Sequence, residues 1–386
     1  MGARDGAAPL NVTRHHAIVS QDASTPPNTP RWDDHPGLEL PPLMSDAESE
    51  LCVIGLGGTG LTLIDEALAR GVRSVIGIDA QTVGAGAAGR NGGFLLAGTS
   101  EFHHDAVRRL GRDQALHYAH RTAAEITRFA EEFPGLVRVT GSLRIAASRE
   151  ERDDCDLQYA QMRADGLPVE RYRGPEGEGL LFPTDGVFQP LARCRTLAAR
   201  LLTRGAQLYA DTRAEQIAAG AVHCTRATIR ARHVVVAVDG ALERLLPELS
   251  GEVRTARLQM LATAPAPEAR FPRPVYKRYG YDYWQQLPDG CVLFGGGRDT
   301  TPDTEWTDDA TPSGAIQDYL TRTLRSDLGV HAEITHRWAG LVSYTETGLP
   351  ICRALGDGVW ALGGYSGTGN VMGAVLAREA AAAIAR

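Results

Sequence analysis

Hydrophobic residues in this chain occur in two patterns: short continuous runs, and stretches in which they recur every three or four positions. Continuous runs predict strands, and they lie at 50–54, 74–79, 144–147, 207–209, 232–240 and 359–363. Recurrence at three and four positions predicts helices, which are expected at 61–70, 104–133, 150–165, 191–204, 313–328 and 371–386. The run at 232–240 is the most hydrophobic after the first two, which favours a parallel strand buried on both faces.

The order of these elements predicts an α/β fold with two kinds of sheet. Strand, helix and strand follow one another over 50–79, which is the βαβ unit of a parallel sheet. Residues 246–300 instead favour antiparallel sheet, because the runs 279–287 and 291–295 flank the turn sequence Pro288-Asp289-Gly290. Residues 1–48 show no hydrophobic periodicity and contain two Pro-Pro pairs, so we expect an extended or disordered N-terminal arm.

Length and composition are those of a soluble globular protein of two or three domains. The 386 residues are 43% hydrophobic and 23% charged. The net charge of −7 argues against nucleic acid or an anionic membrane as the main partner. Neither a membrane-spanning run nor a secretory signal is expected. Six cysteines without CxxC spacing favour reduced thiols and a cytoplasmic location.

Two features of the charged residues bear on chemistry. Of the 40 basic residues only Lys277 is a lysine, which biased codon usage explains, yet this makes it the only side chain that could serve as a neutral amine near pH 7. The acidic stretch 153–156 contains one cysteine, but on a charged helix it is more typical of a solvated face than of a metal site. No metal is therefore expected.

A glycine motif follows the first strand and predicts a dinucleotide site. The segment Gly55-Leu-Gly-Gly-Thr-Gly60 fits G-x-G-x-x-G between a strand and a helix, whose free N–H groups suit a pyrophosphate. Asp79 follows at the end of the second strand, where a carboxylate can accept hydrogen bonds from ribose hydroxyls. The residues expected to bind the cofactor here are Gly55, Gly57, Gly58, Thr59, Gly60, Asp79 and Ala80. A plain glycine turn is the structural alternative.

Two further glycine clusters favour FAD over NAD. One follows the second strand, at 84–93, and the other opens the last helix, at 363–369. An NAD site needs little more than the first unit, whereas the tricyclic flavin needs backbone on several sides. FAD is therefore the expected cofactor.

From these segments the sequence resembles the FAD-dependent D-amino-acid oxidase-like (DAO) family, and most nearly its γ-glutamylputrescine oxidoreductase-like branch. The resemblance spans residues 30–386, and the Arg90-Asn-Gly-Gly93 sequence is its most specific part. The segments that carry it are 52–60 with 79–80, 86–93, 185–190, 292–297, 347–350 and 363–369, together with Pro30-Arg-Trp32.

The resemblance implies a discontinuous Rossmann-like FAD-binding domain and an α+β substrate domain with an antiparallel sheet. The first would comprise 49–100, 185–245 and 335–386, and the second 101–184 and 246–334. Residues of two segments are then implied to lie along the flavin ring, namely Gly86, Arg90, Asn91, Gly92, Gly93, Gly364, Gly367, Thr368, Gly369, Asn370 and Val371. A helix N-terminus beside the ring suits the anionic reduced flavin.

The implied reaction is removal of hydride from the carbon next to nitrogen in an amine or an N-substituted amino acid, giving an imine. The cofactor carries the hard step, so the protein mainly orients the substrate. Three positions depart from relatives. Val342 stands where amino-acid oxidases of the family hold the substrate carboxylate with arginine, no lysine lies in 292–294, and Thr368 replaces a histidine. The first departure favours amine substrates, and the second leaves the electron acceptor open.

Candidate catalytic residues lie on the expected hairpin. Lys277 could stand in for the missing lysine, with a surface position as the alternative. Strand alternation would put Tyr279, Tyr281 and Tyr283 on one face, and with Trp284 they form an aromatic cluster that suits an amine pocket. Ordinary sheet packing is the alternative for each.

Two rival functions remain open at this point. One is a flavoenzyme that tailors a larger metabolite by C–N oxidation. The other is a non-catalytic flavin- or nucleotide-binding protein in which the three departures mark lost activity. The expected partner is a small amine or an amino-acid-like molecule, and the sequence predicts neither the oligomeric state nor a covalent flavin link.

Overall fold

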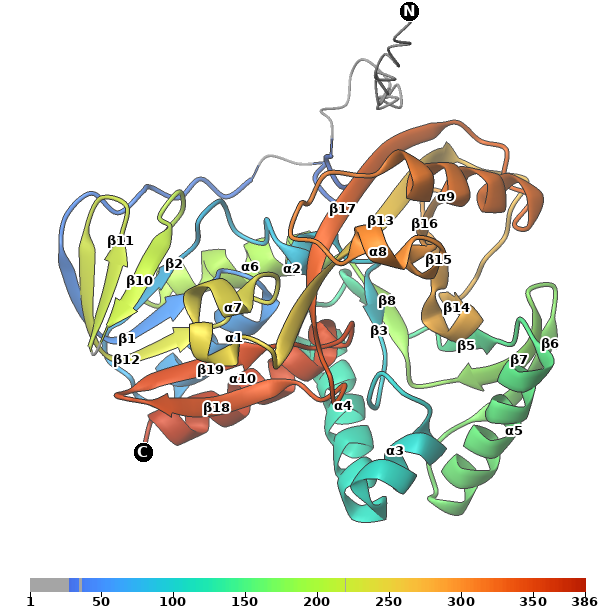
Figure 1. Cartoon of the computed structure of the whole chain (residues 1–386), viewed down its shortest axis with the longest axis horizontal. Helices are drawn as coiled ribbons and strands as arrows, with labels where there is room; N and C mark the ends of the chain where they lie inside the picture. The colour runs from blue at the N-terminus through green and yellow to red at the C-terminus, as the bar shows by residue number, and fades with distance from the viewer. Residues whose placement is uncertain (1–27, 35–36, 219) are drawn as a thin grey trace, which may run out of the picture.

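The structure is a computed structural model that describes residues 28–34, 37–218 and 220–386. Two large sheets lie side by side, each with helices packed against it (Figure 1). The first sheet draws on the beginning, the middle and the end of the chain, and the second mainly on the segments between them.

The first sheet is mixed, with a parallel centre. Its order is β10-β11-β12-β1-β2-β9, and β19 pairs with β12 and β18 with β19. The parallel strands are β1 (Ala47–Ile54), β2 (Val75–Ile78), β9 (Gln207–Tyr209), β12 (Thr228–Val236) and β19 (Val359–Gly363). The antiparallel additions are β10 (Ala214–Ala218), β11 (Ala221–Cys224) and β18 (Ile351–Gly356).

Helices α1 (Gly58–Ala69), α6 (Pro190–Thr203) and α10 (Gly369–Ile384) pack on one face of the first sheet. Their buried side chains, such as Leu61, Leu197 and Ala377, form one core with the strands. The other face is covered by α7 (Leu242–Leu245) and the 3-10 turn η1 (Pro247–Leu249), through Leu242, Leu246 and Leu249. Because the central strands are covered on both faces, the second half of β1 (51–54) and the end of β12 (234–236) are apolar throughout.

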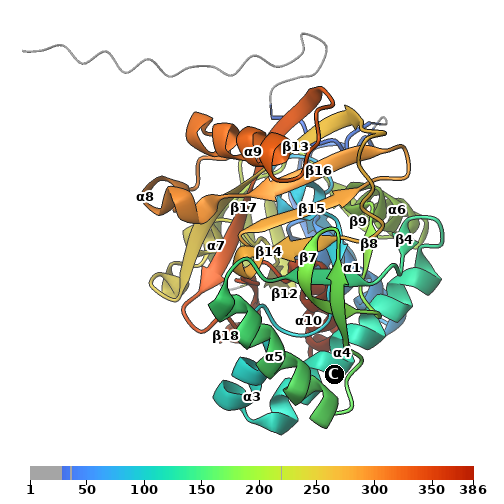
Figure 2. The ribbon, with the colours of Figure 1, turned by 90° about the vertical axis from the view of Figure 1, so that its right-hand side faces the viewer.

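The second sheet has eight strands in the order β17-β13-β16-β15-β14-β5-β7-β6 and is largely antiparallel. Its strands are β5 (Ser142–Ile145), β6 (Glu170–Gly174), β7 (Gly177–Phe182), β13 (Val253–Pro265), β14 (Val275–Lys277), β15 (Asp282–Gln286), β16 (Cys291–Gly296) and β17 (Ile334–Thr345). Figure 2 shows α9 (Gly314–Ser326) above this sheet and α3 (His103–Leu110), α4 (Arg112–Glu132) and α5 (Arg149–Ala164) below it.

Small elements connect the two sheets. β3 (Phe94–Leu95), β8 (Gly186–Phe188) and β4 (Val137–Arg138) form a three-stranded sheet next to the short helix α2 (Ala87–Arg90). Two 3-10 turns and a short helix border the second sheet, namely η2 (Arg278–Gly280), η3 (Arg298–Thr300) and α8 (Pro302–Glu305). The expected α/β architecture with a second, antiparallel sheet is confirmed.

Two of the expected elements are corrected. The helix expected at 104–133 is broken at Gly111, whose φ of 83° is left-handed, so α3 and α4 are separate helices. The strand expected at 279–287 begins only at Asp282, because Tyr279 has a φ of 57° inside η2. Tyr279 therefore does not belong to the strand, and the alternation that grouped it with Tyr283 does not apply.

The domain boundaries stay a proposal, with one adjustment. Residue 335 was expected to begin the last segment of the FAD-binding domain. β17 spans this position and pairs with β13 along its length, from Val253↔Thr345 to Thr263↔Ile334. We therefore propose that this segment begins after β17.

Candidate active site

The carboxyl ends of the parallel strands meet at one edge of the first sheet, beside a cavity of about 820 Å³. This edge is where open α/β sheets place their ligands. The expected cofactor residues that line it are Gly55, Gly57, Gly58, Thr59, Asp79, Ala80, Gly86, Arg90, Asn91, Gly367, Gly369 and Asn370.

The turn between β1 and α1 has the shape that a diphosphate requires. Gly55 has a φ of 108°, and a Cβ there would lie 2.8 Å from the carbonyl oxygen of Ala237. A Cβ at Gly60 would lie 2.0 Å from the oxygen of Gly55, so Gly60 permits close packing and does not line the cavity. The start of α1 has neither a side-chain cap nor an acidic residue among the described residues. Its first N–H groups are therefore available to an anion.

Asp79 lies at the end of β2 and lines the same cavity. Its two carboxylate oxygens accept hydrogen bonds of 2.9 Å from the backbone N–H groups of Leu56 and Gln81. Burial raises the pKa of this carboxyl, and the two N–H donors oppose that shift. The carboxylate is thus fixed in orientation, and its remaining lone pairs can accept from ribose hydroxyls.

Arg193 is a functional candidate that sequence reasoning missed. Its side chain lies 3.9 Å above the Phe129 ring and donates a 2.9 Å hydrogen bond to Thr62 Oγ1. A Cβ at Gly58 would lie 3.2 Å from its Nη1, and its Nε is buried without a partner among the described residues. Burial lowers its pKa to about 10. A buried guanidinium beside a helix N-terminus fits the diphosphate of FAD.

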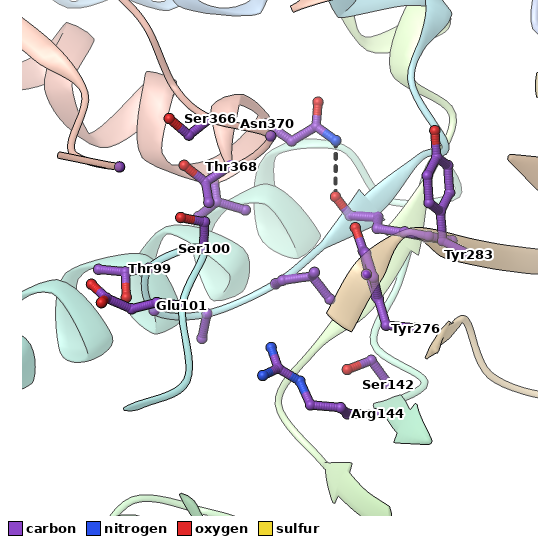
Figure 3. A pocket seen from close by; sticks show the side chains of 18 of the residues that line it. Thr99, Ser100, Glu101, Ser142, Arg144, Tyr276, Tyr283, Ser366, Thr368 and Asn370 are labelled. Carbon is purple, nitrogen blue, oxygen red and sulfur yellow. Dashed lines mark hydrogen bonds between the residues drawn. The ribbon is translucent and has the colours of Figure 1, made fainter. Parts of the chain in front are cut away.

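A second cavity of about 750 Å³ joins the first and extends beneath the second sheet. The two share seven lining residues, namely Ala87, Arg90, Asn91, Gly340, Val342, Gly367 and Asn370. Figure 3 shows part of this cavity, with Asn370, Thr368 and Ser366 on one side and Tyr276, Tyr283 and Arg144 across from them. Gly92 and Val371, both expected at the flavin, line it as well.

The Arg90–Gly93 loop is held rigidly by its own side chains. Arg90 donates to the backbone oxygens of Ala85, Asn28 and Ala339 at 2.9–3.0 Å. Asn91 Oδ1 accepts from the N–H of Gly93 at 2.8 Å and from Asn370 Nδ2 at 3.0 Å. Arg90 thus lines both cavities while its Nε and Nη1 donate within the protein, which makes it a positioning residue for the loop.

The described part of the N-terminal arm packs onto this loop. Trp32 is only 3% exposed, and its Nε1 donates to the Asn91 oxygen. Gln189 Nε2 donates a 2.8 Å hydrogen bond to the Trp32 oxygen, and Leu43 is buried in the core of the first sheet. Disorder is therefore wrong for residues 28–34 and 37–46. The first segment turns at residues 31–32, and the two segments are anchored by the buried side chains of Trp32 and Leu43. Residues 1–27 and 35–36 lie outside the described part.

The start of α10 points at both cavities. Thr368 precedes the helix without capping it, and the first turn contains no acidic residue. Gly364 and Gly367 have φ values of 65° and 90°, which glycine adopts at little cost. Gly364 does not line either cavity, and its N–H donates to Asp239 Oδ1 at 3.0 Å.

Asp239, at the end of the expected strand 232–240, is a second residue whose role the sequence did not reveal. It lies beyond the carboxyl end of β12 and also accepts from the N–H groups of Tyr365 and Ser343 at 3.3 and 3.2 Å. Burial raises its pKa to about 6. Asp239 therefore ties β17 and the loop before α10 to the edge of the first sheet.

One row of paired residues runs across the second sheet, over the Arg90–Gly93 loop. Cα pairing connects Arg144 on β5 to Tyr276, then to Tyr283 and Gly295. The row continues through Met260 to Trp338, whose Nε1 donates a 2.8 Å hydrogen bond to the oxygen of Arg90. Residues directly opposite in neighbouring strands share a face, so this row faces the cavity.

Of the four expected catalytic residues, the structure places two at the cavity. Tyr283 lines it, and a Cβ at Gly92 would lie 3.4 Å from its ring. Tyr281 lines it too and is 36% exposed. Tyr279 also reaches the lining, through the turn η2 rather than from the strand.

The prediction that Lys277 and Trp284 lie at the active site is wrong, because neither residue lines either cavity. Trp284 pairs with Val275 and Phe294 and is buried in the core formed with α9. Lys277 pairs with Ile145, which belongs to the same core face. Side chains alternate along a strand, so both residues point away from the face that carries Tyr276 and Tyr283.

Asp185 lines the second cavity and is a third residue whose role sequence reasoning missed. Its oxygens accept hydrogen bonds from Ser142 Oγ at 2.6 Å and from the N–H of Ala97 at 3.0 Å. Burial raises its pKa to about 7, which the two hydrogen bonds and the charge of Arg144 partly offset. The group can therefore hold or release a proton near neutral pH.

The described residues contain no group of three or more His, Cys, Asp or Glu side chains placed to hold a metal ion. Cys155, expected on a solvated helix face, is 2% exposed and packs in the core beside α5. No described helix is both long enough and apolar enough to cross a membrane.

Comparison with known proteins gives concordant results. The model of the DAO family, described as FAD dependent oxidoreductase, matches residues 50–383. The chain is 28% identical over 362 residues to a probable oxidoreductase, OrdL, of Rhizobium meliloti, covering 86% of this chain and 82% of that protein. It is 25% identical over 351 residues to γ-glutamylputrescine oxidoreductase of Escherichia coli, covering 83% and 80%.

Solved structures share the fold. Glycine oxidase of Geobacillus kaustophilus superposes with a TM-score of 0.74 at 21% identity, over 88% of this chain and 95% of that one. L-proline dehydrogenase of P. horikoshii gives 0.71 at 20% identity, over 87% and 93%.

Proposed function

The chain belongs to the DAO family of FAD-dependent oxidoreductases, and from this premise we propose that it oxidises a carbon–nitrogen bond of a small amine or an N-substituted amino acid. Hydride leaves the carbon next to nitrogen, the nitrogen lone pair forms the C=N bond, and water hydrolyses the resulting imine. FAD, when bound, supplies the two-electron acceptor for this step.

The residues that would hold FAD are divided between the two cavities. Asp79 would accept from the ribose, and the N-terminus of α1 together with Arg193 would bind the diphosphate. The Asn91–Gly92 backbone and the N-terminus of α10 would border the ring. The positive end of a helix dipole stabilises negative charge, which favours electron acceptance there.

The observation that carries the proposal is the junction of the two cavities at the Arg90–Gly92 loop and the start of α10. The second cavity begins there beneath Tyr283 and Tyr276, whose rings lie 5.9 Å apart. Aromatic rings of this kind accommodate an amine through their faces and exclude water. Orientation of the C–H bond is then the main task of the protein.

Two positions set the substrate and the proton chemistry. Val342 lines both cavities with an apolar side chain. It offers no donor to an α-carboxylate, which favours an amine or an N-substituted amino acid over a plain α-amino acid. Asp185 lines the same cavity, and with a pKa of about 7 it can hold or release a proton near neutral pH.

The size of the second cavity supports a second candidate, the tailoring of a larger metabolite. It extends past Tyr276 to alanines of α3 and α4 and to Met162 and Leu167. About 750 Å³ exceeds what a small amine fills.

The six cysteines are all free, which supports a reducing compartment such as the cytoplasm.

The test is flavin reduction by a panel of amines and amino acids. We expect purified protein to carry FAD and its visible absorption to bleach anaerobically with at least one amine. Repetition in air with peroxide detection separates an oxidase from a dehydrogenase. Failure of the whole panel to bleach bound flavin would support the non-catalytic binder, and reduction only by larger conjugates would support the tailoring enzyme.

A further inference from the structure

Arg144 is a cationic residue at the second cavity for which the described residues supply no anionic partner. It lies on β5, lines the cavity, and its guanidinium carbon is 4.1 Å from the centre of the Phe102 ring. Figure 3 shows its guanidinium directed into the cavity beside Ser142. No hydrogen bond or ion pair of this side chain is found among the described residues.

Two carboxylates, those of Asp185 and Glu151, act on Arg144 through their charge, and both already accept hydrogen bonds from other groups. Asp185 accepts from Ser142 and Ala97. Glu151 accepts from the backbone N–H groups of Ala147 at 2.8 Å and Tyr279 at 2.6 Å. Burial lowers the pKa of Arg144, and these neighbouring carboxylates only partly offset this. Arg144 is half-buried and its guanidinium donors are not used within the described residues, so they are available to an anion in the cavity.

The position of Arg144 along the sheet fixes how far this anion lies from the flavin end. Arg144 pairs with Tyr276, and Tyr276 with Tyr283, whose ring lies against Gly92. Neighbouring strands are ~4.8 Å apart, so the Cα of Arg144 is roughly 10 Å from that of Tyr283. A carboxylate on the oxidised carbon itself is too close to that carbon to reach across this distance.

We propose that Arg144 binds a carboxylate at the far end of the substrate, several bonds from the carbon–nitrogen bond that is oxidised. This rests on the proposed function and deepens it: the substrate is an amine with a remote acidic group. A carboxylate is favoured over a phosphate because it matches the guanidinium fork in a bidentate pair, and one guanidinium neutralises its single charge. Arg144 is then a specificity-determining residue.

Arg298 is the rival cation in the same cavity. Its guanidinium lies within 4.7–5.5 Å of the rings of Tyr344, Trp306 and Tyr281. Tyr344 lies two residues from Val342 on β17, and both line the cavity. A carboxylate on the α-carbon of the substrate would bind beside Arg298. Binding at Arg144 instead requires the carboxylate to be at the far end of the substrate.

Arg171 provides a matched control. It continues the same row beyond Arg144, since Leu180 pairs with both residues. Its guanidinium also stacks on an aromatic ring, that of Tyr159 at 4.5 Å, but it is exposed and lies outside the cavity. Arg171→Met therefore removes the same charge from the same sheet without touching the proposed site.

The experiment compares straight-chain ω-amino acids with unbranched primary amines of equal length on the FAD-loaded protein. The pair 6-aminohexanoate and hexylamine is the central probe, and 3-aminopropanoate is the short one. Binding is measured by anaerobic calorimetry and by the concentration dependence of flavin bleaching. A charge-assisted bidentate pair predicts that 6-aminohexanoate binds about 10-fold or more tightly than hexylamine. The short acid should gain nothing.

The variants decide the assignment. Arg144→Met should abolish the preference for the acid, Arg144→Lys should retain part of it, and Arg171→Met should leave it unchanged. Retained flavin content in each variant shows that the fold is intact. Equal binding of acid and amine to the native protein overturns the proposal, as does a preference that survives Arg144→Met or that Arg298→Met removes instead.

Failure of the proposed function gives a different result. If no amine bleaches the flavin, oxidation is rejected, while calorimetry still reports whether the acid binds through Arg144. If amines bleach the flavin but the acid shows no preference, oxidation stands and the remote carboxylate is rejected.

Discussion

The indole Nε1 of Trp32 donates a 2.7 Å hydrogen bond to the backbone oxygen of Asn91. A residue ahead of the first strand therefore fixes the loop that borders both cavities. Asn28 does the same from the other side, because its Oδ1 accepts from Arg90 and from the N–H of Ala339 at 3.0 and 2.9 Å. The loop is positioned by the arm as much as by the sheet.

Replacing Trp32 with phenylalanine tests this support. Trp32→Phe retains an apolar ring but leaves the Asn91 oxygen without its donor, which costs about 1 kcal/mol. We expect FAD to bind several-fold more weakly, measured as the dissociation constant of FAD from the holoprotein. Trp360→Phe on β19 alters an indole that lines neither cavity. It should leave that constant unchanged, and equal losses in both variants would reject the role of Trp32.

Arg193 is predicted to separate cofactor affinity from stability. Arg193→Met removes a buried guanidinium whose Nε has no partner among the described residues. Replacing buried charge by an apolar chain of similar length is often neutral or stabilising, so the apoprotein should melt at the same or a higher temperature. FAD affinity should fall about 10-fold to 100-fold because a charge-assisted contact to the diphosphate is lost.

The control for Arg193 lies on the same helix. Arg200 forms an ion pair of 2.7 Å with Asp65 and does not line the cavities. Arg200→Met should leave FAD affinity within about twofold of the native value, since losing a half-exposed ion pair has a small effect. An Arg193→Met protein that keeps native FAD affinity would contradict the diphosphate assignment.

Asp185 predicts a pH dependence of stability with a definite sign. Its pKa is about 7 in the folded protein and near 3.9 when unfolded. Between these values the folded state binds a proton that the unfolded state does not, so stability falls as pH rises from about 4 to about 7. The slope from this one group reaches at most ~1.4 kcal/mol per pH unit.

The comparison of native protein with Asp185→Asn isolates this contribution. Asp239 has a pKa of about 6 and contributes a slope of the same sign to both proteins. The difference in free energy of unfolding between the two proteins should therefore change across this range and stay constant above about pH 8. A difference that does not vary with pH would reject the elevated pKa of Asp185.

Lys277 is predicted to be silent in catalysis. It points to the face of β14 that packs toward α9, away from the cavity. Lys277→Met should leave the rate of flavin reoxidation by oxygen within about twofold of native. The charge of Lys277 lies on the far side of the sheet from the Arg90–Gly93 loop. Stopped-flow reoxidation measures this, and a marked slowing would restore Lys277 as a candidate.

How much the sequence could predict depends on how local each feature is. The strand, glycine turn and helix at 50–70 are encoded within one short segment, and the structure has them where they were expected. Lys277 lies on the face opposite to Tyr283 because Tyr279 turns the chain with a positive φ, which resets the alternation. Trp284 directly follows Tyr283 on β15, so alternation along the strand places it on the opposite face. The hydrophobic pattern of a sequence does not show where a tyrosine adopts a left-handed backbone conformation.

Features that depend on long-range pairing could not be predicted. Arg144 reaches the cavity because β5 pairs in parallel with β14, some 130 residues later in the chain. Arg193 is one of many arginines on amphipathic helices, and only the packing of α6 against α1 brings it to Gly58. Charge and helical position alone do not distinguish it from its neighbours.

The Arg90–Gly93 loop is also held by a residue of α10. Asn370 Nδ2 donates to Asn91 Oδ1 at 3.0 Å and to the Phe94 oxygen at 2.9 Å, and the helix that carries it begins at Gly369. During synthesis these contacts cannot form until the final helix has left the ribosome. The cofactor site therefore depends on the helix that begins at Gly369, and truncation before residue 369 should yield a chain that does not retain FAD.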